Sequence, residues 1–171
     1  MEKNITLIGM MGAGKSSVAE FLAEQISGYL SIDSDNIIQS KINMMIPDIF
    51  KIKGEKFFRD TEKKIIKKIY TRNRQIIALG GGAFEDKENQ DLILHNSIVI
   101  YLQASPQILY SRLQKSYHRP LLGENFTIET IKNILVNREK IYKLANFTFN
   151  TDNKDAQSIA TEITGLLHAR S

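Results

Sequence analysis

The sequence has 171 residues, no cysteine, 42% hydrophobic residues, 25% charged residues and a formal net charge of +4. These values indicate one soluble domain of ordinary size, which we expect to span residues 1–171 and to act in the cytoplasm as a monomer. They exclude a disulfide scaffold and a thiolate metal site, and we expect neither a membrane nor a nucleic acid as partner, because no apolar run is long enough to span a bilayer and the positive charge is modest.

The first predicted strand leads into a phosphate-binding loop. Residues 5–8 form an apolar run, residues 18–26 repeat apolar side chains at helical spacing, and residues 9–16 between them satisfy G-x-x-x-x-G-K-[ST]. In such a loop, backbone N–H groups and the start of the helix surround phosphate oxygens, Lys15 adds a positive charge, and Ser16 offers its hydroxyl to magnesium. The stretch predicts a site for a nucleotide polyphosphate with Mg²⁺; the alternative is a glycine-rich turn without a ligand.

Two carboxylates follow the second predicted strand, residues 29–32. A kinase needs one carboxylate near magnesium and another near the attacking hydroxyl, and Asp33 and Asp35 can supply both. The third and fourth strands end without an acidic residue, so Asp33 is the favoured magnesium ligand. The alternative is that one of the two aspartates only caps a helix that starts near Asn36.

The stretch between the second and third strands is longer than one crossover helix needs. Pro47 and Gly54 interrupt it, and we expect a helical insertion over residues 34–71 that walls off a second ligand. Residues 63–69 alternate lysines with isoleucines at helical spacing. That pattern is typical of the solvated face of an amphipathic helix.

The third predicted strand, residues 75–79, ends in the three consecutive glycines Gly80, Gly81 and Gly82. Three glycines are costly in backbone entropy, and one would suffice for a turn. We therefore expect a ligand pressed against bare backbone, whose N–H groups can meet an oxygen. The alternative is a plain flexible turn.

An irregular segment follows the fourth predicted strand, residues 97–102. Residues 114–126 carry no clear periodicity, and we expect a lid there; the alternative for a loop of that length is a disordered segment. Arg119 within it can close over the transferring phosphoryl group, where negative charge spreads over the oxygens. The alternative for Arg119 is an ordinary surface position.

An arginine falls on the apolar stripe of the helix expected over residues 127–145. That residue is Arg138, and an arginine that points inward needs an anion. Arg59 lies beside the apolar stripe of the earlier helix, three residues before Glu62, which can hold it by an i,i+3 pair. Two such arginines can grip a carboxylate in bidentate fashion. For each of them the alternative is an internal salt bridge.

The alternation of strands and helices, with a last strand at residues 147–150, predicts an α/β fold with a parallel sheet covered by helices on both faces. In such sheets ligands bind beyond the carboxyl ends of the strands. The phosphate loop, the aspartates and the triple glycine all follow strands, so the sequence predicts one site at that edge.

Taken together and in this order, the landmarks resemble shikimate kinase, a family of small P-loop enzymes, over nearly the whole chain. The landmarks are residues 9–16, 33–35, Phe50, residues 57–59, residues 80–82, Arg112, residues 119–122 and residues 137–142. The resemblance implies a three-layer α/β/α P-loop kinase with a five-stranded parallel sheet in the order 2-3-1-4-5. It also implies ATP-dependent phosphorylation of the 3-hydroxyl of shikimate, in the route to chorismate and aromatic amino acids, with Mg²⁺ as cofactor.

The same resemblance implies roles for individual residues. Lys15, Asp35 and Arg119 would be catalytic, with Asp35 at the attacking hydroxyl and Arg119 entering from the lid. Ser16 and Asp33 would hold the metal. The implied ATP-binding residues are Gly12, Ala13, Gly14, Lys15, Ser16, Ser17, Arg112, Arg119 and Asn153. The implied shikimate-binding residues are Asp35, Phe50, Phe58, Arg59, Gly80, Gly81, Gly82 and Arg138.

Three other functions share parts of this pattern. A GTP-binding switch would need Asp-x-x-Gly after a strand and Asn-Lys-x-Asp before the last helix, and the sequence has neither. A nucleic-acid ATPase would need an acidic residue at the end of the third or fourth strand and an aromatic platform for base stacking, and we identify neither in the sequence. A related small-metabolite kinase, such as a gluconate kinase, need not carry arginines at both 59 and 138.

Overall fold

Five parallel strands form one sheet in the order β2-β3-β1-β4-β5. The computed structural model describes residues 3–114 and 126–169. The strands are β1 (Asn4–Ile8), β2 (Leu30–Asp33), β3 (Gln75–Ala78), β4 (Ser97–Gln103) and β5 (Phe147–Asn150). Each agrees with its predicted run to within one residue at either end, and the predicted sheet order is confirmed.

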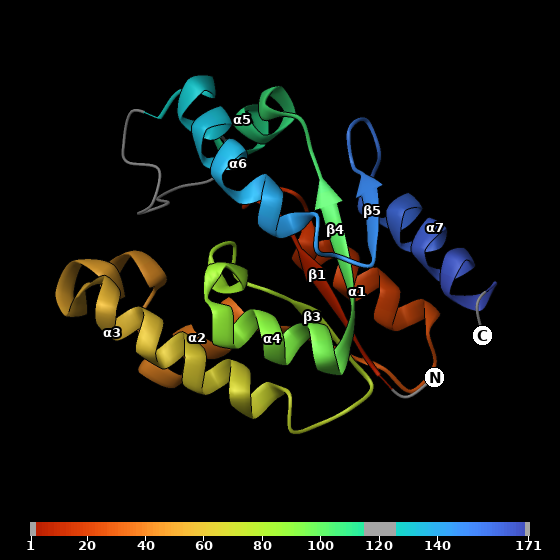
Figure 1. The fold of residues 1–171 in the computed structure, drawn as a ribbon, viewed down its shortest axis with the longest axis horizontal. Helices are drawn as coiled ribbons and strands as arrows, with labels where there is room; N and C mark the ends of the chain where they lie inside the picture. The colour runs from red at the N-terminus through yellow and green to blue at the C-terminus, as the bar shows by residue number, and fades with distance from the viewer. Residues whose placement is uncertain (1–2, 115–125, 170–171) are drawn as a thin grey trace.

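Helices connect the strands and cover the sheet. They are α1 (Lys15–Gln25), α2 (Ser34–Ile42), α3 (Ile46–Ile69), α4 (Lys87–Asn96), α5 (Pro106–Gln114), α6 (Ile128–Tyr142) and α7 (Ala156–His168), with one 3₁₀ turn, η1 (Ala83–Glu85). In Figure 1, α5 and α6 lie beyond the end of β4 to which its arrow points, which is the carboxyl edge of the sheet. The ligand site of a parallel sheet is expected at this edge.

The central strand β1 is paired with β3 on one side and β4 on the other, with Ile5 opposite Ile76 and Ile98. All five of its residues are buried. A strand buried on both faces reads as a continuous apolar run rather than an alternating one, which is why residues 5–8 carry a clear strand signal.

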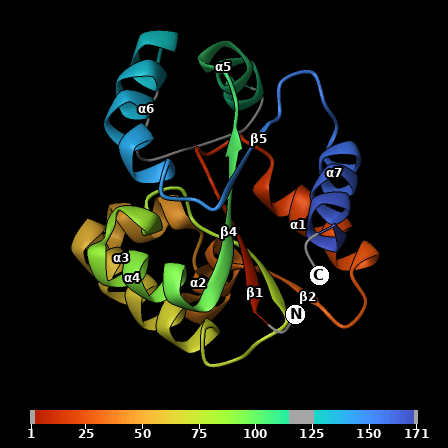
Figure 2. The same ribbon diagram turned by 45° about the vertical axis from the view of Figure 1, so that its right-hand side comes forward.

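Two hydrophobic cores lie on opposite faces of the sheet. The turned view in Figure 2 shows α1 and α7 on one side of the sheet and α2, α3 and α4 on the other. On one face α1 and α7 contribute Leu22 and Ile163, and on the other α2, α3 and α4 contribute Ile38, Ile66 and Ile93. This is the three-layer α/β/α arrangement that the resemblance implied.

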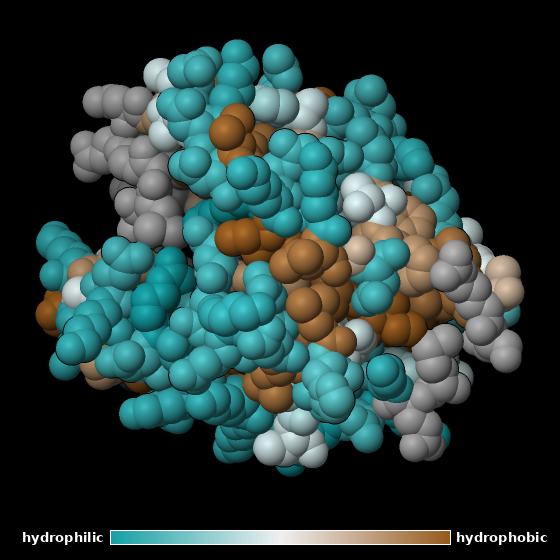
Figure 3. Space-filling view, viewed as in Figure 1, coloured by the Kyte–Doolittle hydropathy of each residue, from teal (hydrophilic) through white to brown (hydrophobic). Residues whose placement is uncertain are grey.

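Two helices, α2 and α3, occupy most of residues 34–71. Helix α3 bends at Gly54, whose φ of 84° lies in the left-handed region that favours glycine. Beyond the bend, isoleucines are buried and Lys64, Lys67 and Lys68 are exposed, so the predicted amphipathic pattern is confirmed. The surface over α3 and α4 is accordingly mostly hydrophilic in Figure 3.

Across the two described ranges of the chain, no helix is both long enough and apolar enough to cross a membrane.

Candidate active site at the carboxyl edge of the sheet

The phosphate loop, residues 9–16, joins β1 to α1. Gly14 is the N-cap residue of α1 with a left-handed φ of 91°, and within the described part of the chain no side chain caps that helix start. The first N–H groups of α1 are therefore available to an anion. Lys15 lies at the same point, where its Nζ donates to the carbonyl oxygens of Gly9 (2.9 Å) and Met10 (3.1 Å). The loop thus combines uncapped N–H groups with a lysine, which is the chemistry of a polyphosphate site.

Asp33 serves two neighbours at once. Its Oδ1 accepts from the backbone N–H groups of Asp35 (2.9 Å) and Asn36 (3.1 Å) and so caps α2, while its Oδ2 accepts from Ser16 Oγ at 2.5 Å. Asp33 therefore does cap a helix, but capping uses only one of its oxygens, and the second faces Ser16 and stays available for the predicted metal. A hydroxyl oxygen and a carboxylate oxygen in contact form a pair of ligands suited to Mg²⁺.

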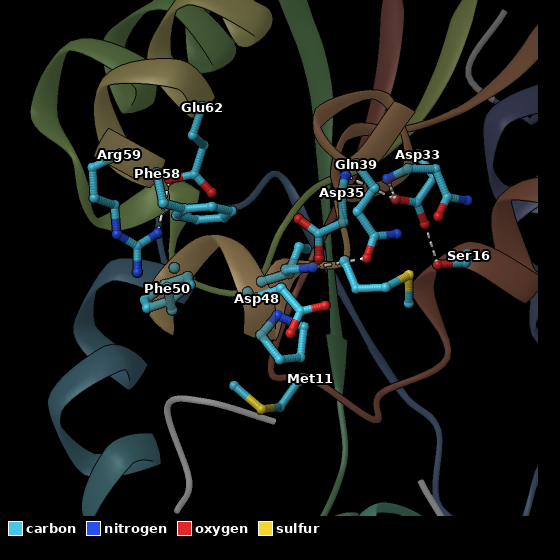
Figure 4. A pocket seen from close by; sticks show the side chains of 16 residues that line it. Met11, Ser16, Asp33, Asp35, Gln39, Asp48, Phe50, Phe58, Arg59 and Glu62 are labelled. Atoms are coloured by element: carbon cyan, nitrogen blue, oxygen red, sulfur yellow. Dashed lines mark hydrogen bonds and ion pairs between the residues drawn. The ribbon is translucent and has the colours of Figure 1, made fainter. Parts of the chain in front are cut away.

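A cavity of about 600 Å³ opens between the phosphate loop, α2 and α3. Figure 4 shows Ser16 and Asp33 on one side of it and Phe58 and Arg59 on the other, with Asp35 and Asp48 in the region between. We call this cavity the acceptor pocket. A smaller cavity of about 220 Å³ lies over the phosphate loop and shares Met11, Ser16, Asp33 and Asp35 with it. The two cavities are thus adjacent spaces on either side of the same residues.

Aromatic and charged residues of α3 line the far side of the acceptor pocket. The rings of Phe50 and Phe58 pack with their centroids 4.7 Å apart, and the Arg59 guanidinium lies 5.2 Å from the centre of the Phe58 ring. Arg59 Nη1 also donates to Glu62 Oε2 at 2.8 Å, which confirms the predicted i,i+3 pair. Burial raises the pKa of Glu62, and the Arg59 guanidinium opposes that rise. Glu62 holds Arg59 against the Phe58 ring at the pocket wall.

Helix α6 contributes the second predicted arginine. Arg138 is buried, as the apolar stripe predicts, and its Nη2 lies 2.6 Å from Glu85 Oε1. Its Nη1 approaches the sulfur of Met10 in the phosphate loop at 3.6 Å. One turn later the Tyr142 hydroxyl donates to the Gly81 carbonyl at 3.0 Å, and burial raises the pKa of Tyr142 so that it remains a donor. Both arginines therefore have internal salt bridges, and both reach the triple glycine.

The glycines are required by the close approach of neighbouring side chains. A Cβ added to Gly80 would lie 2.5 Å from Asp35 Oδ1, and one added to Gly82 would lie 2.9 Å from Arg59 Nη2. Gly80, Gly81 and Gly82 do not have positive φ, so the turn itself does not demand them. The Gly80 N–H donates to Ser34 Oγ at 2.9 Å, which leaves Gly81 and Gly82 to line the acceptor pocket.

Arg112 joins the phosphate loop to the loop that follows β5. Its Nη1 donates to the Gly12 carbonyl and its Nη2 to the Thr151 carbonyl, each at 3.2 Å. Asn153 lies two residues farther along the same loop, in a turn with a left-handed φ of 57°. Arg119 and nearly all of the predicted lid, residues 114–126, lie outside the described residues.

Several residues of this site were not singled out from the sequence. Met11 and Asp48 line the acceptor pocket, Met10 contacts Arg138, and Glu85 pairs with it. Met10 and Met11 stand at positions that the loop motif leaves unspecified. Glu85 is the first acidic residue after the triple glycine, and this position in the sequence was the signal that could have identified it as a residue of the site.

Comparison with known proteins gives a consistent result. A family model described as shikimate kinase matches residues 11–168. A shikimate kinase of Sulfurihydrogenibium sp. is 38% identical over 161 residues, covering 94% of this chain and 95% of the relative. A shikimate kinase of Thermodesulfovibrio yellowstonii is 37% identical, covering 94% and 92%. The solved structure of the shikimate kinase from Acinetobacter baumannii in complex with shikimate is similar with a TM-score of 0.93 and 32% identity, covering 99% of this chain and 94% of that one.

Proposed function

Because the chain belongs to the shikimate kinase family, we propose that it transfers the γ-phosphoryl group of ATP to the 3-hydroxyl of shikimate, giving shikimate 3-phosphate and ADP. The step places the chain in the route to chorismate and aromatic amino acids. None of the matches given above favours a gluconate kinase or a GTP-binding switch.

One observation carries the proposal. Arg59 of α3 and Arg138 of α6 come from distant parts of the sequence and both reach the triple glycine, next to the phosphate loop. Two guanidinium groups with ten N–H donors between them suit a carboxylate. A donor site and an acceptor site that share Met11, Ser16, Asp33 and Asp35 suit direct transfer between ligands.

On the donor side, we assign the triphosphate to the phosphate loop, with Gly12, Ala13, Gly14, Ser16 and Ser17 as contacts. Lys15 exchanges its two carbonyl partners for the β- and γ-phosphates and neutralises charge on the transferring group. Arg112 and Asn153 lie along the adenine. Arg119 enters from a lid over residues 114–126, and it lies outside the described residues.

The pair Ser16 and Asp33 would hold Mg²⁺. Within the described ranges, no group of three or more His, Cys, Asp or Glu side chains is placed to hold a metal ion, so the remaining ligands would be phosphate oxygens and water. The ion would neutralise charge on the phosphate oxygens.

On the acceptor side, Asp35 orients the 3-hydroxyl and accepts its proton as the oxygen attacks phosphorus in line and ADP leaves. Arg59 and Arg138 bind the carboxylate, with backbone of the triple glycine around it. Phe50 and Phe58 pack against the ring. The helical insertion over residues 34–71 forms the wall of this half of the site.

We further propose that the protein works as a cytoplasmic monomer on these small molecules, without nucleic acid or membrane. Two lysines of the basic face of α3 already have partners, Lys63 with Asp86 at 2.7 Å and Lys67 with Glu88 at 3.2 Å, which supports the absence of a nucleic-acid site there. Light scattering of the purified chain at working concentration tests the monomer.

A coupled assay of ADP release tests the function, with shikimate, gluconate and nucleoside monophosphates offered in parallel. We expect turnover with shikimate alone. Turnover with gluconate and none with shikimate would overturn the substrate assignment, and phosphorus NMR of the product identifies the hydroxyl that is modified.

A further inference from the structure

Glu85 stands where two arginines of the acceptor side meet. The turn η1, which directly follows the triple glycine, ends at this residue, and its Oε1 lies 2.6 Å from Arg138 Nη2. The Arg138 side chain is 9% exposed, and a cation buried to that degree is costly without a counter-charge. Arg138 also contacts the Met10 sulfur at 3.6 Å, a weak acceptor, and the Tyr142 side chain, and neither of these carries a negative charge. Glu85 therefore supplies the counter-charge.

The same carboxylate also faces Arg59. A Cβ added to Gly82 would lie 2.9 Å from Arg59 Nη2 and 3.1 Å from Glu85 Oε1, so both atoms approach one point over the bare backbone. Burial lowers the pKa of Arg59, but Glu62, Glu55 and Glu85 raise it and prevail. Arg59 and these three glutamates all line a second cavity, of about 360 Å³, next to the acceptor pocket, and Arg59 and Glu62 line both cavities.

Glu62 and Glu85 differ in how easily each can move away from the arginine with which it pairs. Glu62 is 3% exposed, sits on the same helix as Arg59 and pairs with it at 2.8 Å, so it stays when a ligand arrives. Glu85 is 40% exposed and ends a single 3₁₀ turn, so side-chain rotation is enough to put its carboxylate into water. Of these two carboxylates, Glu85 is the one that can leave its arginine by side-chain rotation when another carboxylate takes its place.

We propose that Glu85 competes with the carboxylate of the acceptor for the guanidinium of Arg138. Glu85 occupies this guanidinium before the acceptor binds, and the acceptor's carboxylate displaces it. The inference rests on the proposed function. Its consequence is selectivity: an acceptor with its own carboxylate replaces the contact that Glu85 gives up, whereas a neutral ring alcohol leaves Glu85 in place and gains nothing from Arg138.

The competitor raises the apparent dissociation constant of the acceptor, which equals the intrinsic constant divided by the fraction of molecules in which Arg138 is free. For this pair, in which the Glu85 side chain is 40% exposed, the factor is on the order of fivefold. Its removal changes binding and leaves the chemical step alone, because Glu85 touches no reacting atom.

The test uses the full chain with Glu85→Gln, which removes the charge and keeps the shape, and with Glu85→Ala. We expect the KM for shikimate to fall about fivefold in both variants, with kcat within about twofold of the unchanged protein. Glu88→Gln is the matched control, since it removes the same charge from an exposed pair with Lys67 and should leave KM unchanged. Shikimate methyl ester, which lacks the carboxylate charge, should bind all four proteins equally.

An unchanged or increased KM in both Glu85 variants would overturn the proposal, since it would mean that Glu85 orients Arg138 instead of competing for it. The proposal would also be overturned if the Glu85 variants bound the methyl ester more tightly by the same factor as shikimate. The effect would then not depend on the carboxylate of the ligand.

Calorimetric binding of cyclohexanecarboxylate to the unchanged protein and to Glu85→Gln separates this inference from the proposed function. Tighter binding to the variant supports competition even if shikimate proves not to be phosphorylated, and equal binding refutes competition even if it is.

Discussion

Gly80→Ala tests the placement of Asp35 without altering Asp35 itself. The new Cβ would lie 2.5 Å from Asp35 Oδ1, whereas ordinary contacts begin at 3.4 Å. The carboxylate must therefore move by about 0.9 Å, the difference between these two distances. A displacement of about 1 Å at a reacting group costs on the order of 100-fold in rate, so kcat should fall by that factor.

The same substitution should leave the fold and the donor side intact. Gly80 does not have a positive φ, so alanine fits its backbone conformation. The atoms that the new Cβ meets most closely, Asp35 Oδ1 and Glu62 Oε1 at 3.2 Å, are the ends of side chains and not backbone. We expect the melting temperature to shift by only a few degrees and the KM for ATP to stay within about twofold.

Gly165→Ala provides the control. It makes the same chemical change within α7, where an added Cβ has nothing within 4 Å, and alanine favours a helix interior by about 1 kcal/mol. Its kcat should be unchanged and its melting temperature slightly higher. If Gly80→Ala folds and turns over within twofold of the unchanged protein, Asp35 does not contact the attacking hydroxyl.

Three further substitutions divide the site by role. Lys15→Ala should abolish turnover, since positioning and charge neutralisation supply most of the catalysis of phosphoryl transfer; a near-normal kcat would remove Lys15 from that role. Arg138→Leu should raise the KM for shikimate by about 10- to 100-fold and leave ATP affinity nearly intact, whereas equal damage to both would indicate a structural arginine. Asp35→Asn should lower kcat more than shikimate affinity measured by calorimetry, and an unchanged rate would contradict its contact with the hydroxyl.

The parts of the site that the sequence predicted are those carried by local pattern. Residues 9–16 are one continuous motif, and the pair of Arg59 and Glu62 follows from their spacing on one helix. The inward direction of Arg138 follows from the apolar stripe of α6. Each of these needs only the geometry of a single element.

The contacts that were missed depend on how elements pack. Glu85 and Arg138 belong to η1 and α6, which meet only because both cover the carboxyl edge of the sheet. The sequence predicted a ligand at the triple glycine, which stays a prediction, but it did not predict that Asp35 and Arg59 approach this backbone, because the neighbours of a turn are set by tertiary structure. The bend in α3 at Gly54 was visible as a glycine, but not as a left-handed residue.

The starts of α1 and α2 both lie at the carboxyl edge of the sheet, but they differ in electrostatic character. This difference fits the phosphoryl donor at α1 and the phosphoryl acceptor at α2. The start of α1 has Gly14 at its N-cap and no side-chain cap within the described part of the chain, so its partial positive charge remains available to phosphate. The start of α2 is capped by Asp33 and carries Asp35 in its first turn, so negative charge already compensates the helix dipole there. A polyphosphate is therefore attracted to the first helix, while the second presents carboxylates that suit a metal ion and a hydroxyl proton. Since both helices line adjoining cavities, glycine at one N-cap and aspartate at the other fit the proposed placement of the triphosphate at α1 and of the acceptor hydroxyl at α2.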